Sequence, residues 1–365
     1  MNKILEFMIV EREMVPVMSK LPISVCIIGK NEERFLEGCL EKIVPYGFEI
    51  IFTDTGSTDR TKEIALQYTD KVYEFEWIQD FAAAKNFCES KASNDWILSL
   101  DCDEYIQNID LELLEAFLKK DETLVGTLQI ENLVRNGDAI GKSNQKINRL
   151  YNRKYCHFEG RIHEQVRYKK GGPLHISDVP IEVLHYGYAL SPEELELKNQ
   201  RNISLLMEEI KKNPNEPYYY FQLGQSYAVL EDYENVFQYL HKGLELSPDP
   251  NQEYVQHMLI DYGNAMLHTG RYAIALNLEG VYDILADYSD YLFMMGKVYY
   301  ANQQLVKALE TFVRATMAPK CIVFGTNSFF PLNSMALIYE QMGENALAEN
   351  CREQVQELLK KAKFE

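Results

Sequence analysis

The chain has 365 residues, enough for two or three domains of ordinary size, each able to bury its own core. Its net charge of −18 would repel a nucleic-acid backbone or an anionic membrane, so neither is an expected partner. Seven cysteines without a Cys-x-x-Cys pair argue against a disulfide framework and a structural zinc site. We therefore expect a cytoplasmic protein, and no apolar run is long enough to predict a membrane span.

Up to about Arg201 the chain alternates apolar runs with amphipathic stretches. This alternation predicts an α/β domain in which crossover helices cover a mostly parallel sheet. The expected strands are 23–28, 49–53, 71–75, 96–100 and 123–130, with short polar strands near 145–151 and 181–185. The expected helices are 33–43, 59–68 and 81–91, with N-caps at Asp59 and Asp80.

A long charged helix is expected next, from its N-cap Ser191 to about Lys212, and the proline-bounded stretch 213–217 ends it. Beyond Pro217 the chain becomes rich in tyrosine, leucine and alanine, which recur with a spacing of about 34 residues. The residues in phase are Tyr220, Leu223, Gly224, Tyr227, Pro248, Gly263, Gly270, Tyr272, Ala275, Gly296, Tyr299, Ala308, Phe312, Leu332, Ala336, Tyr339, Gly343 and Ala348. This pattern predicts four tetratricopeptide repeats, in which paired helices approach closely at the small residues; the alternative is a non-repetitive helical bundle.

Three carboxylates follow the buried strand expected at 96–100. Asp101, Asp103 and Glu104 come where the strand ends, and ligands of parallel sheets gather at the carboxyl ends of strands. Carboxylates at positions i and i+2 can converge on one Mg²⁺ or Mn²⁺ ion, which in turn clamps a diphosphate. The alternative is a solvated acidic turn.

The first two expected strands also end in polar segments. Asn31 and Glu32 follow the first strand and Asp54 the second, so all three are expected at one cleft. Asp54 can accept hydrogen bonds from a base or a ribose, while Gly56 allows the backbone a close approach. The alternative for Asp54 is a role within the turn.

Segments 31–33, 54–59, 80–86 and 101–104 together resemble, in order and spacing, family 2 glycosyltransferases with the GT-A fold, a Rossmann-like mostly parallel sheet. The resemblance covers about residues 22–188. With the attached repeats, the chain looks like the subgroup of the sublancin-type peptide S-glycosyltransferases.

The resemblance implies roles for individual residues. Asn31, Glu32, Asp54 and Lys85 would bind a UDP-sugar donor, with Asp54 at the uracil. Asp101 would contact the ribose or a metal ion, and Asp103 the metal ion directly. Lys85 stands where the family often has arginine, which changes the geometry of any bidentate contact.

Two histidines and an arginine are further candidates. His163 and Glu164 resemble a His-Glu segment on the acceptor side, and a carboxylate or imidazole is what an inverting transfer needs as its base. Glu164 is preferred to His163. His185 stands where several GT-A enzymes have an additional metal ligand. Arg149 either reaches the diphosphate or orders a lid, and a surface ion pair is its alternative.

The sequence thus predicts a GT-A catalytic domain over 1–190, a linker helix over 191–216 and a tetratricopeptide-repeat domain over 217–365. The expected function is inverting transfer of a hexose or N-acetylhexosamine from a UDP-sugar, with Mn²⁺ or Mg²⁺, to a peptide or protein side chain. The repeats would bind that acceptor or a second copy of the enzyme. Two alternatives are an acceptor that is a cell-surface glycan or lipid-linked precursor, and a non-catalytic repeat scaffold that binds nucleotide.

Overall fold

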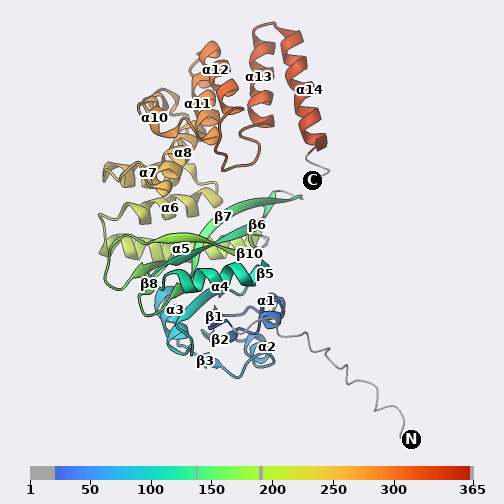
Figure 1. The fold of residues 1–365 in the computed structure, drawn as a ribbon. Coiled ribbons are helices and arrows are strands. Elements are labelled where there is room, and N and C mark those ends of the chain that lie inside the picture. Colours follow the sequence, from blue (N-terminus) through green and yellow to red (C-terminus); the bar gives the residue numbers. More distant parts are fainter. Residues whose placement is uncertain (1–20, 137–138, 189–191, 362–365) are drawn as a thin grey trace, which may run out of the picture. The chain divides into compact units, whose positions relative to one another are not determined.

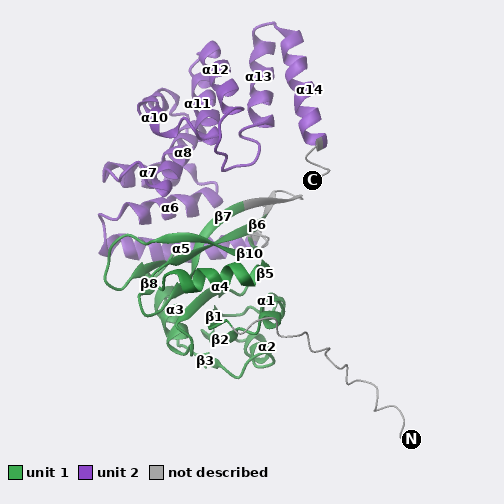
Figure 2. Ribbon diagram, in the orientation of Figure 1, with its two compact units in different colours: residues 1–190 green, residues 191–365 purple. Residues whose placement is uncertain are grey.

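The computed structural model describes residues 21–136, 139–188 and 192–361. The chain divides into two compact units, Met1–Leu190 and Ser191–Glu365 (Figure 2). Each unit is described by itself. Ser191, the expected N-cap of the linker helix, lies outside the described residues.

The first unit contains a mixed sheet of eight strands in the order β3-β2-β1-β4-β7-β6-β10-β5, and β8 and β9 form a separate hairpin (Figure 1). The strands β1 to β4 run parallel to one another, whereas β7 pairs antiparallel with both β4 and β6. The strands are β1 (Ile23–Gly29), β2 (Glu49–Asp54), β3 (Val72–Glu74), β4 (Trp96–Asp101), β5 (Glu104–Ile109), β6 (Val125–Asn136), β7 (Ala139–Asn152), β8 (Cys156–Glu159), β9 (Gln165–Tyr168) and β10 (Ile176–Tyr188).

Apolar side chains cover both faces of the central strands, as the continuous apolar runs of the sequence predict. Val25 and Ile27 of β1 belong to a core cluster shared with helices α1 (Leu36–Ile43), α2 (Thr61–Ala65) and α4 (Leu111–Lys120), whereas Cys26 between them packs on the opposite face with α3 (Phe81–Ser90). In the β1–β2 register Gly29 lies beside Asp54, and in the β1–β4 register Ile28 lies beside Asp101. The carboxyl ends of β1, β2 and β4 therefore meet at one edge.

The helices of the first unit are α1 (Leu36–Ile43), the short 3-10 helix η1 (Val44–Tyr46), α2 (Thr61–Ala65), α3 (Phe81–Ser90) and α4 (Leu111–Lys120). Asp80 caps α3 as predicted, because its carboxylate accepts the Ala83 N–H at 2.8 Å. Helix α1 begins later than predicted because Glu33 N–H and the Glu33 carboxylate bond to the facing segment at Asp59 and Arg60.

Helix α2 is shorter than predicted, and its N-cap position is Arg60 rather than Asp59. The Asp59 carboxylate instead accepts hydrogen bonds from the Thr61 N–H at 3.0 Å and from the Thr61 hydroxyl at 2.6 Å. The expectation of a cap at Asp59 is therefore wrong by one residue. Strand β5, helix α4 and the hairpin β8–β9 were absent from the predicted elements.

The regular elements in the described part of the second unit, 192–361, are helices, and one isolated bridge joins Tyr288 to Lys320. The helices are α5 (Pro192–Lys212), α6 (Pro217–Val229), α7 (Tyr233–Glu245), α8 (Glu253–His268), α9 (Tyr272–Ala275), η2 (Leu276–Val281), α10 (Tyr282–Leu285), α11 (Ser289–Ala301), α12 (Leu305–Ala315), α13 (Phe329–Gln341) and α14 (Asn345–Lys361) (Figure 1). Four helical hairpins follow α5, as the 34-residue spacing predicts. In the second hairpin, three short pieces (α9, η2 and α10) stand in place of one regular helix.

Close approach within the hairpins explains the recurring small residues. A Cβ placed on Gly296 of α11 would lie 2.4 Å from the Phe312 ring of α12, closer than carbon atoms can approach. Gly296 and Phe312 are both among the residues expected to recur in phase. The repeat architecture predicted from the sequence is confirmed.

Six of the seven cysteines are buried, and only Cys321, between α12 and α13, is exposed. Burial raises the pKa of the Cys39 and Cys102 thiols, which keeps both protonated. None of the described helices combines the length and the apolar character that crossing a bilayer requires.

Candidate active site

The acidic segment lies in a tight turn between β4 and β5. Asp101 is the last residue of β4 and Glu104 the first of β5. The Asp101 N–H donates to Glu104 Oε2 at 3.0 Å, and the Cys39 thiol donates to the Glu104 carbonyl oxygen at 3.3 Å. These bonds fix the turn in place at the carboxyl end of the central strands.

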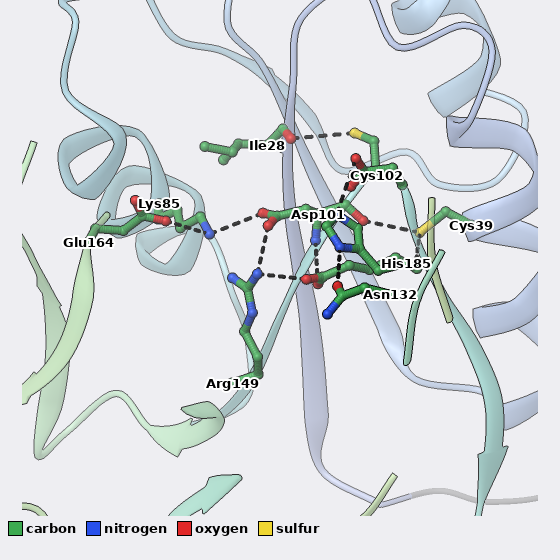
Figure 3. A network of polar contacts seen from close by, with 11 residues as sticks. Ile28, Cys39, Lys85, Asp101, Cys102, Asn132, Arg149, Glu164 and His185 are labelled. Carbon is green, nitrogen blue, oxygen red and sulfur yellow. Dashed lines mark hydrogen bonds and ion pairs between the residues drawn. The ribbon is translucent and has the colours of Figure 1, made fainter. Parts of the chain in front are cut away.

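A network of ion pairs connects this turn to two other parts of the first unit (Figure 3). Lys85 Nζ of α3 lies 3.1 Å from Asp101 Oδ1 and 2.8 Å from Glu164 Oε1. Arg149 Nη2 of β7 lies 2.6 Å from Asp101 Oδ2 and 2.7 Å from Glu104 Oε1. Asp101 therefore receives one cationic side chain on each carboxylate oxygen.

Ion pairing keeps Asp101, Lys85 and Arg149 in their charged forms, whereas burial raises the pKa of Glu104. Burial alone would raise the pKa of Asp101, but the charges of Arg149 and Lys85 outweigh it and hold that pKa well below the ordinary value. Burial alone would lower the pKa of Lys85, whereas Asp101 and Glu164 together raise it. The pKa of Arg149 is raised in the same way, since burial is outweighed by Asp101 and Glu104.

The predicted base, Glu164, enters the network through the turn of the β8–β9 hairpin. This turn, residues 160–164, contains two left-handed residues, Gly160 with φ 98° and His163 with φ 52°. Left-handed backbone is unusual for a residue with a side chain, and such positions gather at functional sites. The turn directs the Glu164 carboxylate to Lys85, 79 positions earlier in the sequence; His163, its neighbour, is half-buried.

His185 and Asp103 form a second part of the site. His185 Nε2 lies 3.4 Å from Asp103 Oδ2, and its Nδ1–H donates to the Asn132 side-chain oxygen at 2.7 Å. Because that oxygen can only accept, the hydrogen bond fixes the tautomer of the neutral imidazole and leaves Nε2 as the basic nitrogen. Burial lowers the pKa of His185, but the Asp103 carboxylate raises it by more than burial lowers it, so the net shift is upward.

The donor atoms of this second part fit a divalent cation. A Cβ on Gly187 would lie 2.3 Å from His185 Nε2 and 2.5 Å from Asp103 Oδ2, so the glycine leaves open the space that both atoms border. An imidazole nitrogen and a carboxylate oxygen are suitable ligands for Mn²⁺. The described residues contain no group of three histidine, cysteine, aspartate or glutamate side chains arranged for a metal ion, because Asp101 is turned to Lys85 and Arg149.

The predicted donor-binding residues Asn31 and Asp54 both accept hydrogen bonds from the loop that follows β2. The Asp54 carboxylate accepts the Gly56 N–H at 3.3 Å and the Ser57 N–H at 3.1 Å, which is the turn role weighed as its alternative. The Asn31 side-chain oxygen accepts the Thr58 N–H at 2.8 Å, with Asn31 itself left-handed at φ 59°.

Glu32 lies in the same place, where its N–H donates to the Thr61 hydroxyl at 2.7 Å. The structure thus brings Asn31, Glu32 and Asp54 together at the carboxyl ends of β1 and β2. Their contact with a nucleotide stays a prediction.

Three residues of the site were missed or left without a role in the sequence. Asn132 of β6 orients His185 of β10 because the two residues lie opposite each other where these strands pair. Glu104 anchors Arg149, and Gly187 leaves space at the imidazole. A glycine two positions after a candidate metal ligand is a signal that the sequence did offer; the pairing with Asn132, 53 residues away, is not visible in it.

Comparison with protein families defines the class of the two units. The family described as glycosyl transferase family 2 matches residues 24–169, and the tetratricopeptide repeat matches residues 217–250. The first unit therefore contains a family 2 glycosyltransferase domain with a GT-A-like sheet, and the second contains tetratricopeptide-like repeats. The resemblance expected from the four motifs is confirmed.

Individual relatives combine the same features. A TPR repeat-containing protein of Synechococcus elongatus is 28% identical over 242 residues, covering 64% of this chain and 59% of the relative. The SPbeta prophage-derived glycosyltransferase SunS of Bacillus subtilis is 28% identical over 234 residues, covering 62% of this chain and 54% of SunS, which supports the expected subgroup. An uncharacterized glycosyltransferase of Rickettsia bellii is 31% identical over 157 residues, covering 40% of this chain and 53% of the relative. The chain thus spans between half and three-fifths of the length of these relatives.

Proposed function

We infer that this protein transfers a hexose or N-acetylhexosamine from a UDP-sugar to a peptide or protein side chain, with inversion at the anomeric carbon. One observation carries the proposal: Lys85 binds the Asp101 carboxylate of the donor motif at 3.1 Å and the Glu164 carboxylate at 2.8 Å. A single ammonium thus holds the proposed donor-side carboxylate and the proposed base close together, and a single displacement needs donor and base at one centre.

In the proposed reaction, Glu164 accepts the proton of the acceptor nucleophile as that atom bonds to the anomeric carbon. The bond between the anomeric carbon and the diphosphate oxygen breaks, and UDP leaves with the electron pair. The nucleotide is held at the carboxyl ends of β1 and β2 by Asp54, Asn31 and Glu32. The charges of Lys85 and Arg149 lie beside the position where negative charge accumulates, and fixed charges in a buried site stabilise a transition state strongly.

A divalent cation, Mn²⁺ or Mg²⁺, would be held by Asp103 and His185 and would neutralise charge on the departing diphosphate. Asp101 was expected to share this task. With both of its oxygens on cationic side chains, we assign Asp101 to the ribose and to the orientation of Lys85 instead. The repeats are proposed to bind the peptide or protein acceptor, since stacked helical hairpins provide extended binding surfaces.

The test is donor consumption. The protein is incubated with a panel of UDP-sugars and Mn²⁺, and released UDP is measured with and without a pool of candidate peptides. Release should occur with one donor and disappear in Asp103→Ala. The matched control is Asp178→Ala, which removes an equally charged but exposed side chain paired with Lys146.

Mass spectrometry of the peptide pool then reports the mass of the sugar and the modified residue. Sugar found only on an added glycan or lipid-linked acceptor would replace the peptide acceptor with the first alternative. UDP binding without consumption of any donor would establish the scaffold alternative and refute catalysis.

A further inference from the structure

Asn86, the last residue of the motif at 80–86, makes contacts that the proposed reaction does not use. Its side-chain Nδ2 donates to the Phe158 carbonyl oxygen at 2.9 Å, and its Oδ1 accepts the Phe158 N–H at 2.9 Å. One amide therefore satisfies both backbone groups of one residue, as a neighbouring strand would. Asn86 follows Lys85 directly, so consecutive residues of α3 contact the backbone and the carboxylate of the same hairpin.

Phe158 lies in β8, which pairs with β9 and not with the main sheet. The hairpin has little support of its own, because an isolated two-stranded hairpin is marginally stable in water. Cys156, Phe158 and Val166 of the hairpin pack in a core cluster with side chains of α3 and of the main sheet, and the start of α3 adds hydrogen bonds. Besides the two Asn86 bonds, the Phe81 N–H donates to the Arg161 carbonyl oxygen at 2.9 Å, and Arg161 Nε donates to the Gln79 carbonyl oxygen at 3.1 Å.

The fixed hairpin determines where Glu164 lies. The turn that carries Glu164 begins two residues after Phe158 and is closed by the pairing of Glu159 with Gln165. If Phe158 shifts, the turn shifts with it, and the Glu164 carboxylate leaves its place beside Lys85. A displacement of about 1 Å at a reacting group costs on the order of 100-fold in rate.

We propose that Asn86 is a positioning residue that acts through the β8–β9 hairpin to place Glu164. This inference rests on the proposed function, because it takes Glu164 as the base. The proposed role of Asn86 differs from that of its neighbour Lys85, because the charge of Lys85 also acts on the donor side.

A double-mutant cycle tests the inference. Asn86→Ala, Glu164→Gln and the double variant are compared for kcat of sugar transfer and for affinity toward UDP. Asn86→Ala alone should lower kcat about 10- to 100-fold with UDP affinity unchanged. In the Glu164→Gln background the same change should cost less than about twofold, because residues that act as one unit are not additive. The control Asn94→Ala removes another bonded asparagine, which donates to the Ser24 hydroxyl at 3.1 Å at the opposite end of the sheet, and should leave kcat intact.

Equal losses in both backgrounds, or a loss of UDP affinity, would overturn the inference in favour of a general structural role. Hydrogen exchange of the amides from Phe158 to Glu164 gives a second readout that needs no activity. Exchange should be faster in Asn86→Ala than in the unchanged protein or Asn94→Ala, and equal exchange would refute the inference even if no donor were consumed. Absence of turnover in the unchanged protein, together with faster exchange in Asn86→Ala, would instead count against the proposed function alone.

Discussion

The ion-pair network of the first unit and helix α8 of the repeat unit bury acidic groups in opposite ways. In the network, Asp101 and Glu104 lie against Arg149, and Lys85 joins Asp101 to Glu164, so each of these carboxylates faces a cation.

In the repeat unit, the half-buried Asp261 of α8 accepts a hydrogen bond from a neutral amide, that of Gln225. Burial raises the pKa of Asp261 to about 7, with a further contribution from the charge of Asp290. The neighbouring cations hold the pKa of Asp101 low and keep it ionised, whereas the carboxyl of Asp261, beside which the described residues place no cation, changes its charge near pH 7.

The largest effect on catalysis is expected at Glu164, the carboxylate that ends the ion-pair network. Glu164→Gln preserves shape and removes the negative charge, so kcat for sugar transfer should fall by about 10²- to 10⁴-fold, the usual contribution of a general base. Steady-state kinetics with the donor identified above measure the change. Glu159→Gln, an exposed position in the same hairpin, is the control and should keep its activity. Activity unchanged in Glu164→Gln would remove Glu164 as the base.

Breaking the ion-pair network itself should cost stability. Arg149→Met leaves the buried Glu104 without its cation, while Asp101 keeps Lys85 as a partner. Loss of one partner of a buried pair costs about 3–5 kcal/mol in the free energy of unfolding. Urea unfolding followed by tryptophan fluorescence isolates the first unit, because both tryptophans, Trp77 and Trp96, lie in it.

Arg60→Met is the matched control for this stability measurement. It removes an exposed arginine whose pair with Glu63 should contribute less than about 1 kcal/mol. Equal losses in the two variants would contradict the ion-pair network as the source of stability.

A smaller effect is expected beside the network, at the proposed cation site. Asn132→Leu removes the acceptor that orients His185, and loss of such a supporting hydrogen bond lowers metal affinity about 10- to 100-fold. Titration with Mn²⁺ followed by electron paramagnetic resonance measures affinity without turnover. Asn144→Leu, at an exposed position of β7, serves as the control. If Mn²⁺ binds equally well to both variants, His185 is not oriented for the ion by Asn132.

The smallest effect is expected in the repeat unit and concerns pH. A carboxyl whose folded-state pKa is about 7, above its ordinary value, binds its proton more tightly in the folded state, so stability falls as pH rises from about 4 to 7. Asp261→Asn should remove the part of this fall that Asp261 contributes and should stabilise the unit at pH 8 more than at pH 5. Thermal unfolding followed by circular dichroism at pH 5 and pH 8 measures it.

Asp283→Asn, an exposed change in α10, should keep the pH dependence of the unchanged protein. If stability depended more steeply on pH in Asp261→Asn than in the unchanged protein, the raised pKa of Asp261 would be contradicted.

Local patterns in the sequence sufficed for much of the fold. Strands β1, β2 and β4 and the four helical hairpins follow from apolar runs and from the 34-residue spacing, which depend on neighbours along the chain. Helix α4 also had such a signal, since Asp110 caps it and Leu114 and Phe117 fall on one face, yet it was missed. The hairpin β8–β9 had weaker signals, because its strands are only four residues long.

The candidate site was predictable in its residue types but not in its contacts. Asp101, Lys85 and Glu164 were all named from motifs, yet nothing local indicates that Lys85 joins the other two. Arg149 was left between three roles, and only the fold shows that it binds Asp101 and Glu104. Contacts between distant segments depend on sheet order and strand register, which residue types alone do not encode.

The distribution of thiols in the fold has a practical consequence. Since Cys321 alone is exposed and the remaining six are enclosed in cores, a maleimide dye should label the native protein at one defined point, in the connection between α12 and α13. Changes in the fluorescence of that label would then test whether the helical hairpins bind a peptide, without waiting for a donor sugar to be identified.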